Sequence, residues 1–593
     1  MTSRVRAVAP FAGYAVLVAW YCAPLFASPN GVGIYDWDQH LFYYASVFKS
    51  VASYGAFPFW NPWYCGGNVL WQNPQIPLLS PVFALGLTMS LPLAMKVSIA
   101  LHFWIGLCGM HLLLRELSPE QPLPVTLSLA SIAVLSGAMA LHLAVGHSVF
   151  LPVLYLPLQA YFLVRAFRTG AVRHVVYAAI PLALMIYNGA LHAVPMSVAG
   201  VGVMSIGAAV ATRSVRPIAV GLLVGVLGVA YAAPKLLPVV QFVTSERFVD
   251  ARGAGEHPDA MSLEMLARTY LDRYQDRSPR YPEQRNAWYE YGNYVGVFGA
   301  AAIAAGVLLA FVVPGTPDRW IGLSLAGTTV LFLALSAGEF ASWAPASLAR
   351  HVPVFSSFRI PSRYTFGVVL FGIATAGWAW RAVADGAVRH RGRSLVVATL
   401  FGLVAFDVAV QTRDQFIESF NLAPLDRPFT LGGGSPEPPV VDVTTSAYSP
   451  DAPMVRALNR NVAFYNCYES LQLARTAGPS ERWLSSDTAT LSDIRFAPNR
   501  IEFAAIVGRE PARVSLHQNF APGWQSTAGP VVPGNGDGMV VTLPPGTAGR
   551  FAFMFTPPWL WPGAAIALVA VVVSAAFRRR HLWSADPGGA AHD

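Results

Sequence analysis

The chain has 593 residues, of which 54% are hydrophobic and only 12% are charged, and its mean hydropathy is +0.45. Soluble globular chains carry roughly 25% charged residues, so this composition excludes an ordinary soluble protein and indicates a membrane protein. The net charge of +8 does not indicate a nucleic-acid partner, because the basic residues form short clusters between apolar runs.

Twelve apolar runs could cross a bilayer, since a spanning helix needs about 20 residues. In chain order they are 7–27, 97–117, 124–141, 148–168, 174–190, 193–212, 217–237, 293–314, 320–337, 364–384, 394–412 and 557–577. A further run, 77–92, is short and broken by three prolines. The first run follows two arginines, as in a signal peptide, but it is long and no small-x-small cleavage site follows it. We therefore expect an uncleaved helix.

The arginines orient these helices, because cytoplasmic loops are enriched in Lys and Arg. With the N-terminus in the cytoplasm, the clear basic clusters fall on the inner side: Arg115; Arg165, Arg168 and Arg173; Arg213 and Arg216; Arg319; Arg381, Arg389, Arg391 and Arg393; and Arg578, Arg579 and Arg580. This holds only if 77–92 does not cross, so we predict a re-entrant or interfacial segment there. Both termini are then cytoplasmic.

This topology divides the chain into three regions. Residues 1–412 form a membrane domain with outer loops 28–92, 238–292 and 338–363, residues 413–556 a β-rich domain outside the membrane, and residues 557–593 a last span and cytoplasmic tail. The runs RIEFAAIV (500–507) and RFAFMF (550–555) alternate roughly with period two between Pro/Gly turns. This pattern is typical of an antiparallel β-sandwich. Cys65 and Cys467 both fall outside, where they could pair.

Two carboxylates, Asp36 and Asp38, begin the first outer loop at the start of a segment that we expect to be a surface helix ending at Gly55. One could act as a general base facing a membrane-embedded cavity, while the other orients it, binds a metal or caps the helix. Both could also be purely structural, because Asp is favoured at helix N-termini. Asp36 is the better cap, which slightly favours Asp38 as the base. Gln39 and His40 follow as candidate substrate-binding residues.

Aromatic and amide side chains interleave in WNPWYCGGNVLWQNPQ (60–75). Carbohydrate sites use both kinds, because rings stack on sugar faces and amides pair with hydroxyl groups. The candidate sugar-binding residues are Trp60, Asn61, Trp63, Asn68, Gln72, Asn73 and Gln75. An interfacial aromatic belt would explain the rings but explains the amides less well.

Two arginines, Arg359 and Arg363, lie in FRIPSR at the outer mouth of a predicted helix, where positive charge opposes the usual bias. We expect them to bind a phosphate, together with Lys235 at a similar outer position. Interfacial anchoring or salt bridges to Glu339 are the structural alternative. Further candidates for substrate binding at outer helix ends are Glu290, His147 and His192. Asp407 lies within a span, where we favour a buried structural pairing.

The order of these features resembles the YfhO-like bacterial membrane proteins, which are grouped with GT-C-type glycosyltransferases. The matching patches are the Asp-rich start of the first loop, WNPWYCGGNVLWQNPQIPLLSP, WYEYGNYVG, FRIPSR and PGWQSTAGP…LPPGTAGRFAFMFTPP. The resemblance implies a polytopic GT-C-like membrane domain in the bacterial cytoplasmic membrane. It also implies sugar transfer on the outer face from a polyprenyl-phosphate-linked donor to a glycan, polymer, lipid or protein acceptor.

The same resemblance assigns the base to Asp36 or Asp38 and phosphate contacts to Arg359 and Arg363. The chain has Asp-Trp-Asp and not the adjacent acidic pair of some GT-C branches, so a divalent metal, Mg²⁺ or Mn²⁺, stays an open question.

An inverting transferase is therefore the leading hypothesis. A lipid or glycolipid flippase would carry polar residues through the membrane centre, whereas the polar groups here gather at the outer ends. A non-catalytic cell-envelope assembly protein is the third hypothesis, which the aromatic-amide loop and the paired arginines weakly oppose.

Overall fold

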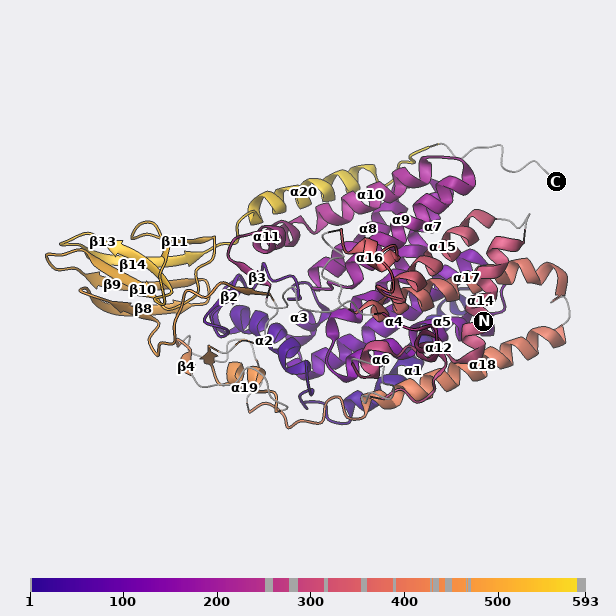
Figure 1. Cartoon of the computed structure of the whole chain (residues 1–593), viewed down its shortest axis with the longest axis horizontal. Coiled ribbons are helices and arrows are strands. Elements are labelled where there is room, and N and C mark those ends of the chain that lie inside the picture. Colours follow the sequence, from indigo (N-terminus) through magenta and orange to yellow (C-terminus); the bar gives the residue numbers. More distant parts are fainter. Residues whose placement is uncertain are drawn as a thin grey trace.

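The computed structural model describes residues 3–250, 260–276, 286–313, 318–352, 360–387, 391–426, 429, 437–442, 451–465, 467 and 471–583. It consists of a helical body and a β-rich domain that projects from one end of that body (Figure 1). The last helix, α20 (Leu560–Phe577), starts beside the β-rich domain and runs back along the helical body (Figure 1).

Each of the twelve predicted runs coincides with one helix or with two consecutive helices. They are α1 (Ser3–Cys22), α4 (Leu91–Leu117), α5 (Leu123–Val134) with α6 (Gly137–Ala144), η2 (Ser148–Tyr155) with α7 (Leu156–Thr169), α8 (Val172–Tyr187), α9 (Ala193–Thr212), α10 (Arg216–Tyr231) with α11 (Ala233–Val243), α13 (Trp288–Tyr291) with α14 (Gly296–Val312), α15 (Arg319–Ser336), α17 (Thr365–Ala387), α18 (Arg391–Arg413) and α20.

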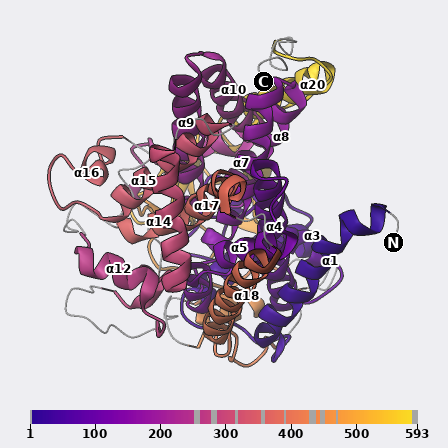
Figure 2. The same cartoon turned by 90° about the vertical axis from the view of Figure 1, so that its right-hand side faces the viewer.

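Among the described residues, nine of these stretches are long and apolar enough to cross a membrane. Helices α10 and α11 pass the same test as a pair bent by 82°, and α8 is a shorter apolar helix. Seen along the helical body, α4, α5, α7 and α17 lie in the middle, and α1, α12 (Leu263–Leu271), α16 (Pro345–Ala349) and α20 lie at the periphery (Figure 2). The protein is a multi-pass membrane protein, and the number of twelve crossings stays a prediction.

The segment 77–92 contains one short helix, α3 (Pro81–Gly86), before α4 begins at Leu91. Six helical residues span about 9 Å, whereas the hydrocarbon core is about 30 Å thick. The segment therefore does not cross the membrane as a helix. Close packing holds it, since a Cβ on Gly86 would lie 3.2 Å from the ring of Phe48.

The helix after the first span, α2 (Trp37–Tyr54), ends at Gly55 in the left-handed conformation (φ 61°), as the sequence predicts. It does not lie on a membrane surface with one face in water, because every residue from Trp37 to Ser50 is buried. The reason is tertiary: α19 (Pro453–Asn459), from the extramembrane region, packs against it.

The C-terminal region contains two four-stranded antiparallel sheets, β12–β13–β10–β7 and β11–β14–β9–β8. The strands are β7 (Leu484–Ser486), β8 (Thr490–Ala497), β9 (Arg500–Ile506), β10 (Ala512–Leu516), β11 (Trp524–Ser526), β12 (Val532–Pro533), β13 (Met539–Leu543) and β14 (Ala548–Phe555). Period-two alternation buries Ile501, Phe503 and Ala505 of β9. Inward-facing residues of both sheets belong to one apolar core, which is the arrangement that a sandwich requires.

The two regions are joined by short strand pairs and a disulfide. Strand β3 (Phe248–Asp250) of the second outer loop pairs with β6 (Leu471–Leu473), and Tyr64 of the first outer loop forms a bridge with Phe464 of β5 (Val462–Phe464). Within the extramembrane region, β4 (Val440–Asp442) pairs in parallel with β5. The first loop forms the hairpin β1 (Trp60–Asn61) and β2 (Asn68–Val69). A disulfide joins Cys65, in this hairpin, to Cys467.

We predict that denatured, unreduced protein exposes two reactive thiols, because Cys22 and Cys108 are free while Cys65 and Cys467 are paired. Mass-tagged maleimide should add two labels before reduction and four after it. Four labels before reduction would contradict the disulfide.

The fold also predicts opposite accessibility for two surface positions. In a background carrying Cys22→Ser and Cys108→Ser, Gln525→Cys on β11 should react with a membrane-impermeant maleimide in intact cells. Arg579→Cys, just after α20, should react only after permeabilisation, because α20 separates the two. Equal labelling of both positions in intact cells would contradict the topology.

Candidate active site

Five residues that the sequence singled out separately lie together in the structure. Hydrogen bonds and ion pairs connect Asp36 to His147, and Arg363 to both Glu290 and His192. His142 links the two groups, since it contacts His147 and lies close to Glu290. We call Asp36, His142, His147, His192, Glu290 and Arg363 the polar cluster.

Asp36 reaches the cluster because the start of α2 packs tightly on the turn between α6 and η2. The backbone N–H of Asp36 donates to the carbonyl of Val145 at 3.0 Å, and the Trp37 indole donates to Leu143 at 2.8 Å. Gly146 has φ 105°, and a Cβ there would lie 2.1 Å from the backbone nitrogen of Trp37. Glycine is therefore required where this turn approaches α2.

Asp36 and the two histidines of the turn form a chain of hydrogen bonds. Oδ2 of Asp36 lies 3.1 Å from Nε2 of His147, and Nδ1 of His147 lies 2.8 Å from Nδ1 of His142. An Nε2–H on His147 that donates to Asp36 leaves its Nδ1 as the acceptor from His142. His142 stacks on Phe150, with ring centroids 4.1 Å apart.

The other half of the cluster is a buried ion pair. Arg363, in η3 (Pro361–Tyr364), donates through Nε to Oε2 of Glu290 at 2.8 Å and through Nη2 to Oε1 at 2.5 Å. The two side chains are only 10% and 5% exposed. Nη1 lies 3.1 Å from Nε2 of His192. The hydroxyl of Ser362 donates to the Glu290 carbonyl at 2.7 Å, so neighbouring residues hold both elements together.

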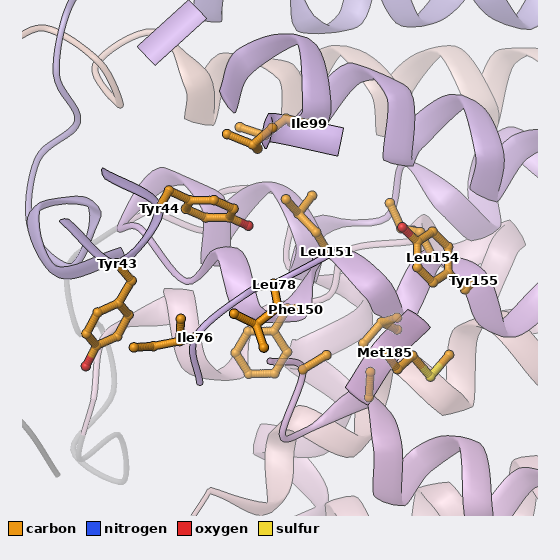
Figure 3. Packing of buried hydrophobic residues seen from close by; sticks show 14 of the residues in the cluster. Tyr43, Tyr44, Ile76, Leu78, Ile99, Phe150, Leu151, Leu154, Tyr155 and Met185 are labelled. Atoms are coloured by element: carbon orange, nitrogen blue, oxygen red, sulfur yellow. The ribbon is translucent and has the colours of Figure 1, made fainter. Parts of the chain in front are cut away.

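Phe150 of η2 packs against both the histidine side and the Arg363 side of the polar cluster. Its ring stacks on His192 with centroids 4.6 Å apart and on His142, and the Arg363 guanidinium lies 5.3 Å from its centroid. Phe150 and Leu78 belong to the same apolar core, part of which is drawn in Figure 3. Residues that belong to one apolar core thus orient both halves of the cluster.

Asp36 is the accessible acid of the cluster, with 26% of its side chain exposed. Burial raises the pKa of Asp36, but hydrogen bonding and charge from His147, with smaller contributions from His40 and Arg363, bring it below its usual value. The carboxylate is therefore ionised at neutral pH. Burial lowers the pKa of His40 to about 4, which keeps that neighbour neutral.

Asp38 has a different environment, which reverses the preference drawn from the sequence. Its Oδ2 accepts from the N–H of Met454 at 3.0 Å and its Oδ1 from that of Val455 at 2.9 Å, and the residue is 2% exposed. Burial raises the pKa of Asp38 to about 7, against the lowering by these two bonds. Asp38 thus caps α19 and faces away from the polar cluster. The structure favours Asp36 as the candidate base.

The aromatic-amide loop is not an exposed sugar-binding surface, because all seven candidate residues are buried. The Trp60 indole donates to Gln518 at 3.0 Å and the Trp63 indole to Asn461 at 3.0 Å. The amides serve the loop itself or nearby helices: Asn61 accepts from Trp63 N–H, Asn68 from Val69 N–H, Asn73 from Gln75 N–H, and Gln72 donates to Gln241. The loop joins the β-rich region to the helices.

Lys235 also serves this loop and offers nothing to a phosphate. Its Nζ donates to the carbonyls of Trp71 and Asn73 at 2.7 Å each and lies 3.3 Å from that of Ile76. All three N–H groups are used, and the side chain is completely buried. Among the other candidates, Gln39 donates to the Tyr43 hydroxyl at 2.7 Å. Arg359 lies outside the described residues.

Asp407 forms a structural pairing, as expected, but the pair is not buried, since the side chains of Asp407 and Arg273 are 33% and 49% exposed. Its Oδ1 accepts from Arg273 at 2.7 Å and its Oδ2 from the Tyr294 hydroxyl at 2.5 Å. Sequence reasoning did not name His142 as a site residue. The signal that could have identified it is the pair of histidines flanking Gly146 at the end of a span.

No family model and no curated protein matches the chain. Among solved structures, it is similar to the arabinofuranosyltransferase AftD from Mycobacteria, with a TM-score of 0.43 and 14% identity over 68% of this chain and 27% of that chain. A mutant form of AftD gives a TM-score of 0.39 and 16% identity over 67% of this chain and 27% of that chain. This chain therefore spans about a quarter of the length of those proteins. At these scores we draw neither the fold nor the activity from the likeness.

Proposed function

We propose that this chain is an inverting membrane glycosyltransferase that moves a sugar from a polyprenyl-phosphate-linked donor to an acceptor on the extracytoplasmic face. The observation that carries the proposal is the ionised, partly exposed carboxylate of Asp36 held by His147 beside the buried Arg363–Glu290 pair. The proposal is supported by the proximity of this carboxylate to a cationic guanidinium within one connected cluster.

Asp36 acts as the general base. Its Oδ2 is engaged by His147, which leaves Oδ1 for the acceptor hydroxyl. As that hydroxyl loses its proton to Asp36, its oxygen bonds to the anomeric carbon of the donor sugar. The bond between that carbon and the phosphate oxygen breaks, and the lipid phosphate leaves with the electron pair. A single displacement inverts the anomeric centre and needs no covalent enzyme intermediate.

Arg363 stabilises the departing phosphate. Hydrogen bonds among the described residues use three of its five N–H groups, two toward Glu290 and one toward His192. The remaining two can reach a phosphate oxygen, which charge assistance would hold strongly. Glu290 keeps the guanidinium in place before the donor binds. Arg359, four residues earlier in the chain, is proposed to add a second phosphate contact.

We predict that Asp36→Asn lowers sugar transfer about 100- to 10,000-fold, because the amide cannot take the proton. Purified protein in liposomes would be given a panel of radiolabelled polyprenyl-phosphate sugars with membrane glycan as acceptor, and donor consumption would be measured. Glu264→Gln, at an exposed carboxylate on α12, is the matched control and should keep wild-type activity. Full activity of Asp36→Asn would refute the assignment, and donor translocation without transfer would indicate a flippase.

We predict that Asp38→Asn acts on stability and not on chemistry. The amide keeps one acceptor oxygen, so one N–H at the start of α19 loses its partner at a cost of about 1–3 kcal/mol. The thermal unfolding midpoint in detergent should fall, while activity per folded molecule is kept. An unchanged unfolding midpoint together with a loss of sugar transfer would instead indicate that Asp38 is the general base.

A further inference from the structure

Three side chains of the polar cluster present metal-binding atoms to one another. One ligand atom each from His142, His147 and Glu290 lies within 4.8 Å of the others. Two ligands of one ion lie at most about 4.2 Å apart when each bond is about 2.1 Å long. Small side-chain rotations therefore suffice to bring all three onto one ion. We propose that these three residues bind a divalent transition-metal ion, Zn²⁺ or Mn²⁺.

The surrounding contacts are those that orient metal ligands. His147 would bind through Nδ1, and its Nε2 already contacts Asp36 at 3.1 Å, which forms the carboxylate–histidine pair common in metal sites. Arg363 and Ser362 fix Glu290 from behind. His142 is held by stacking on Phe150. Each ligand thus has a second partner that limits its rotation.

The donor set selects the class of ion. Two imidazole nitrogens and one carboxylate suit zinc, manganese or iron, whereas Mg²⁺ and Ca²⁺ prefer oxygen ligands alone. Of the two ions that the sequence left open, Mn²⁺ fits this set and Mg²⁺ does not. Three protein ligands also leave coordination positions open, as in catalytic metal sites.

The charge of the cluster is consistent with a cation. Histidines that bind a metal do so as neutral imidazoles, so in the metal-binding state the negative Asp36 and Glu290 and the positive Arg363 give the protein side chains one net negative charge. A divalent ion makes the cluster singly positive, and a sugar-linked phosphodiester carries one negative charge. On the proposed function, an open metal position next to Arg363 is therefore suited to the phosphate of the lipid-linked donor.

Metal binding can be measured without any donor. Protein stripped with a chelator would be titrated with Zn²⁺ or Mn²⁺ by calorimetry, and Co²⁺-loaded protein would be examined for the visible absorption of a bound ion. We expect one equivalent to bind to the wild type. His142→Asn and His147→Asn should abolish this binding, and Asp36→Asn should weaken it about 10- to 100-fold as an orienting partner.

His351→Gln, at an exposed histidine, is the matched control and should bind metal as the wild type does. Thermal unfolding of each variant separates loss of the site from loss of the fold. No binding by the wild type, or equal binding by properly folded His142→Asn and His147→Asn, would overturn the metal site. Bound metal in a protein without transferase activity would support the site and refute the proposed function instead.

Discussion

Glu290 and Arg363 meet where the chain passes from the membrane helices to the outer loops, and their pairing constrains everything around them. A buried ion costs several kcal/mol unless a partner of opposite charge and further hydrogen bonds compensate it. Here the fork of the guanidinium matches both carboxylate oxygens, and His192 and Phe150 complete its surroundings. Removing either charge would leave the other uncompensated, so α13, η3 and the start of α9 are held in one arrangement.

The first outer loop contributes both to the polar cluster and to the contact with the extramembrane region, because the side chains at the start of α2 point in different directions. Successive helical residues are rotated by about 100°, so Asp36 and Asp38 face nearly opposite sides. Asp36 joins the polar cluster, and Asp38 caps α19 of the extramembrane region. One short helix thus connects the candidate active site to the β-rich domain.

The aromatic-amide loop illustrates how one composition supports two functions. Rings with amides are typical of sugar sites, but the same side chains also satisfy a buried junction between domains. The indoles of Trp60 and Trp63 donate hydrogen bonds across that junction, and Lys235 of α11 donates to carbonyls of the loop. The disulfide to Cys467 reinforces the same contact. Solvent exposure of these side chains distinguishes a sugar site from a buried junction. That exposure depends on α11 and the β-rich domain, which are distant from the loop in sequence.

Much of the architecture could be read from local patterns. Hydrophobic run length located the candidate membrane helices, the arginine pattern excluded 77–92 as a span, and period-two alternation located β9 and β14. The bias of arginine between the loops assigned the candidates to one face. These signals are local, because the bilayer imposes the same length and polarity on each segment independently.

The sequence by itself determined that this is a multi-pass membrane protein with an extramembrane β-rich region and a set of polar candidates at the outer helix ends. Only the tertiary structure decided which of those candidates belong together. It brought Asp36, His147, His192, Glu290 and Arg363 into one cluster and added His142 to them. It also showed that Asp38 and Lys235 make structural hydrogen bonds outside this cluster. The reason is that a side chain's role depends on which distant groups satisfy its hydrogen bonds and charge, and no local pattern encodes that.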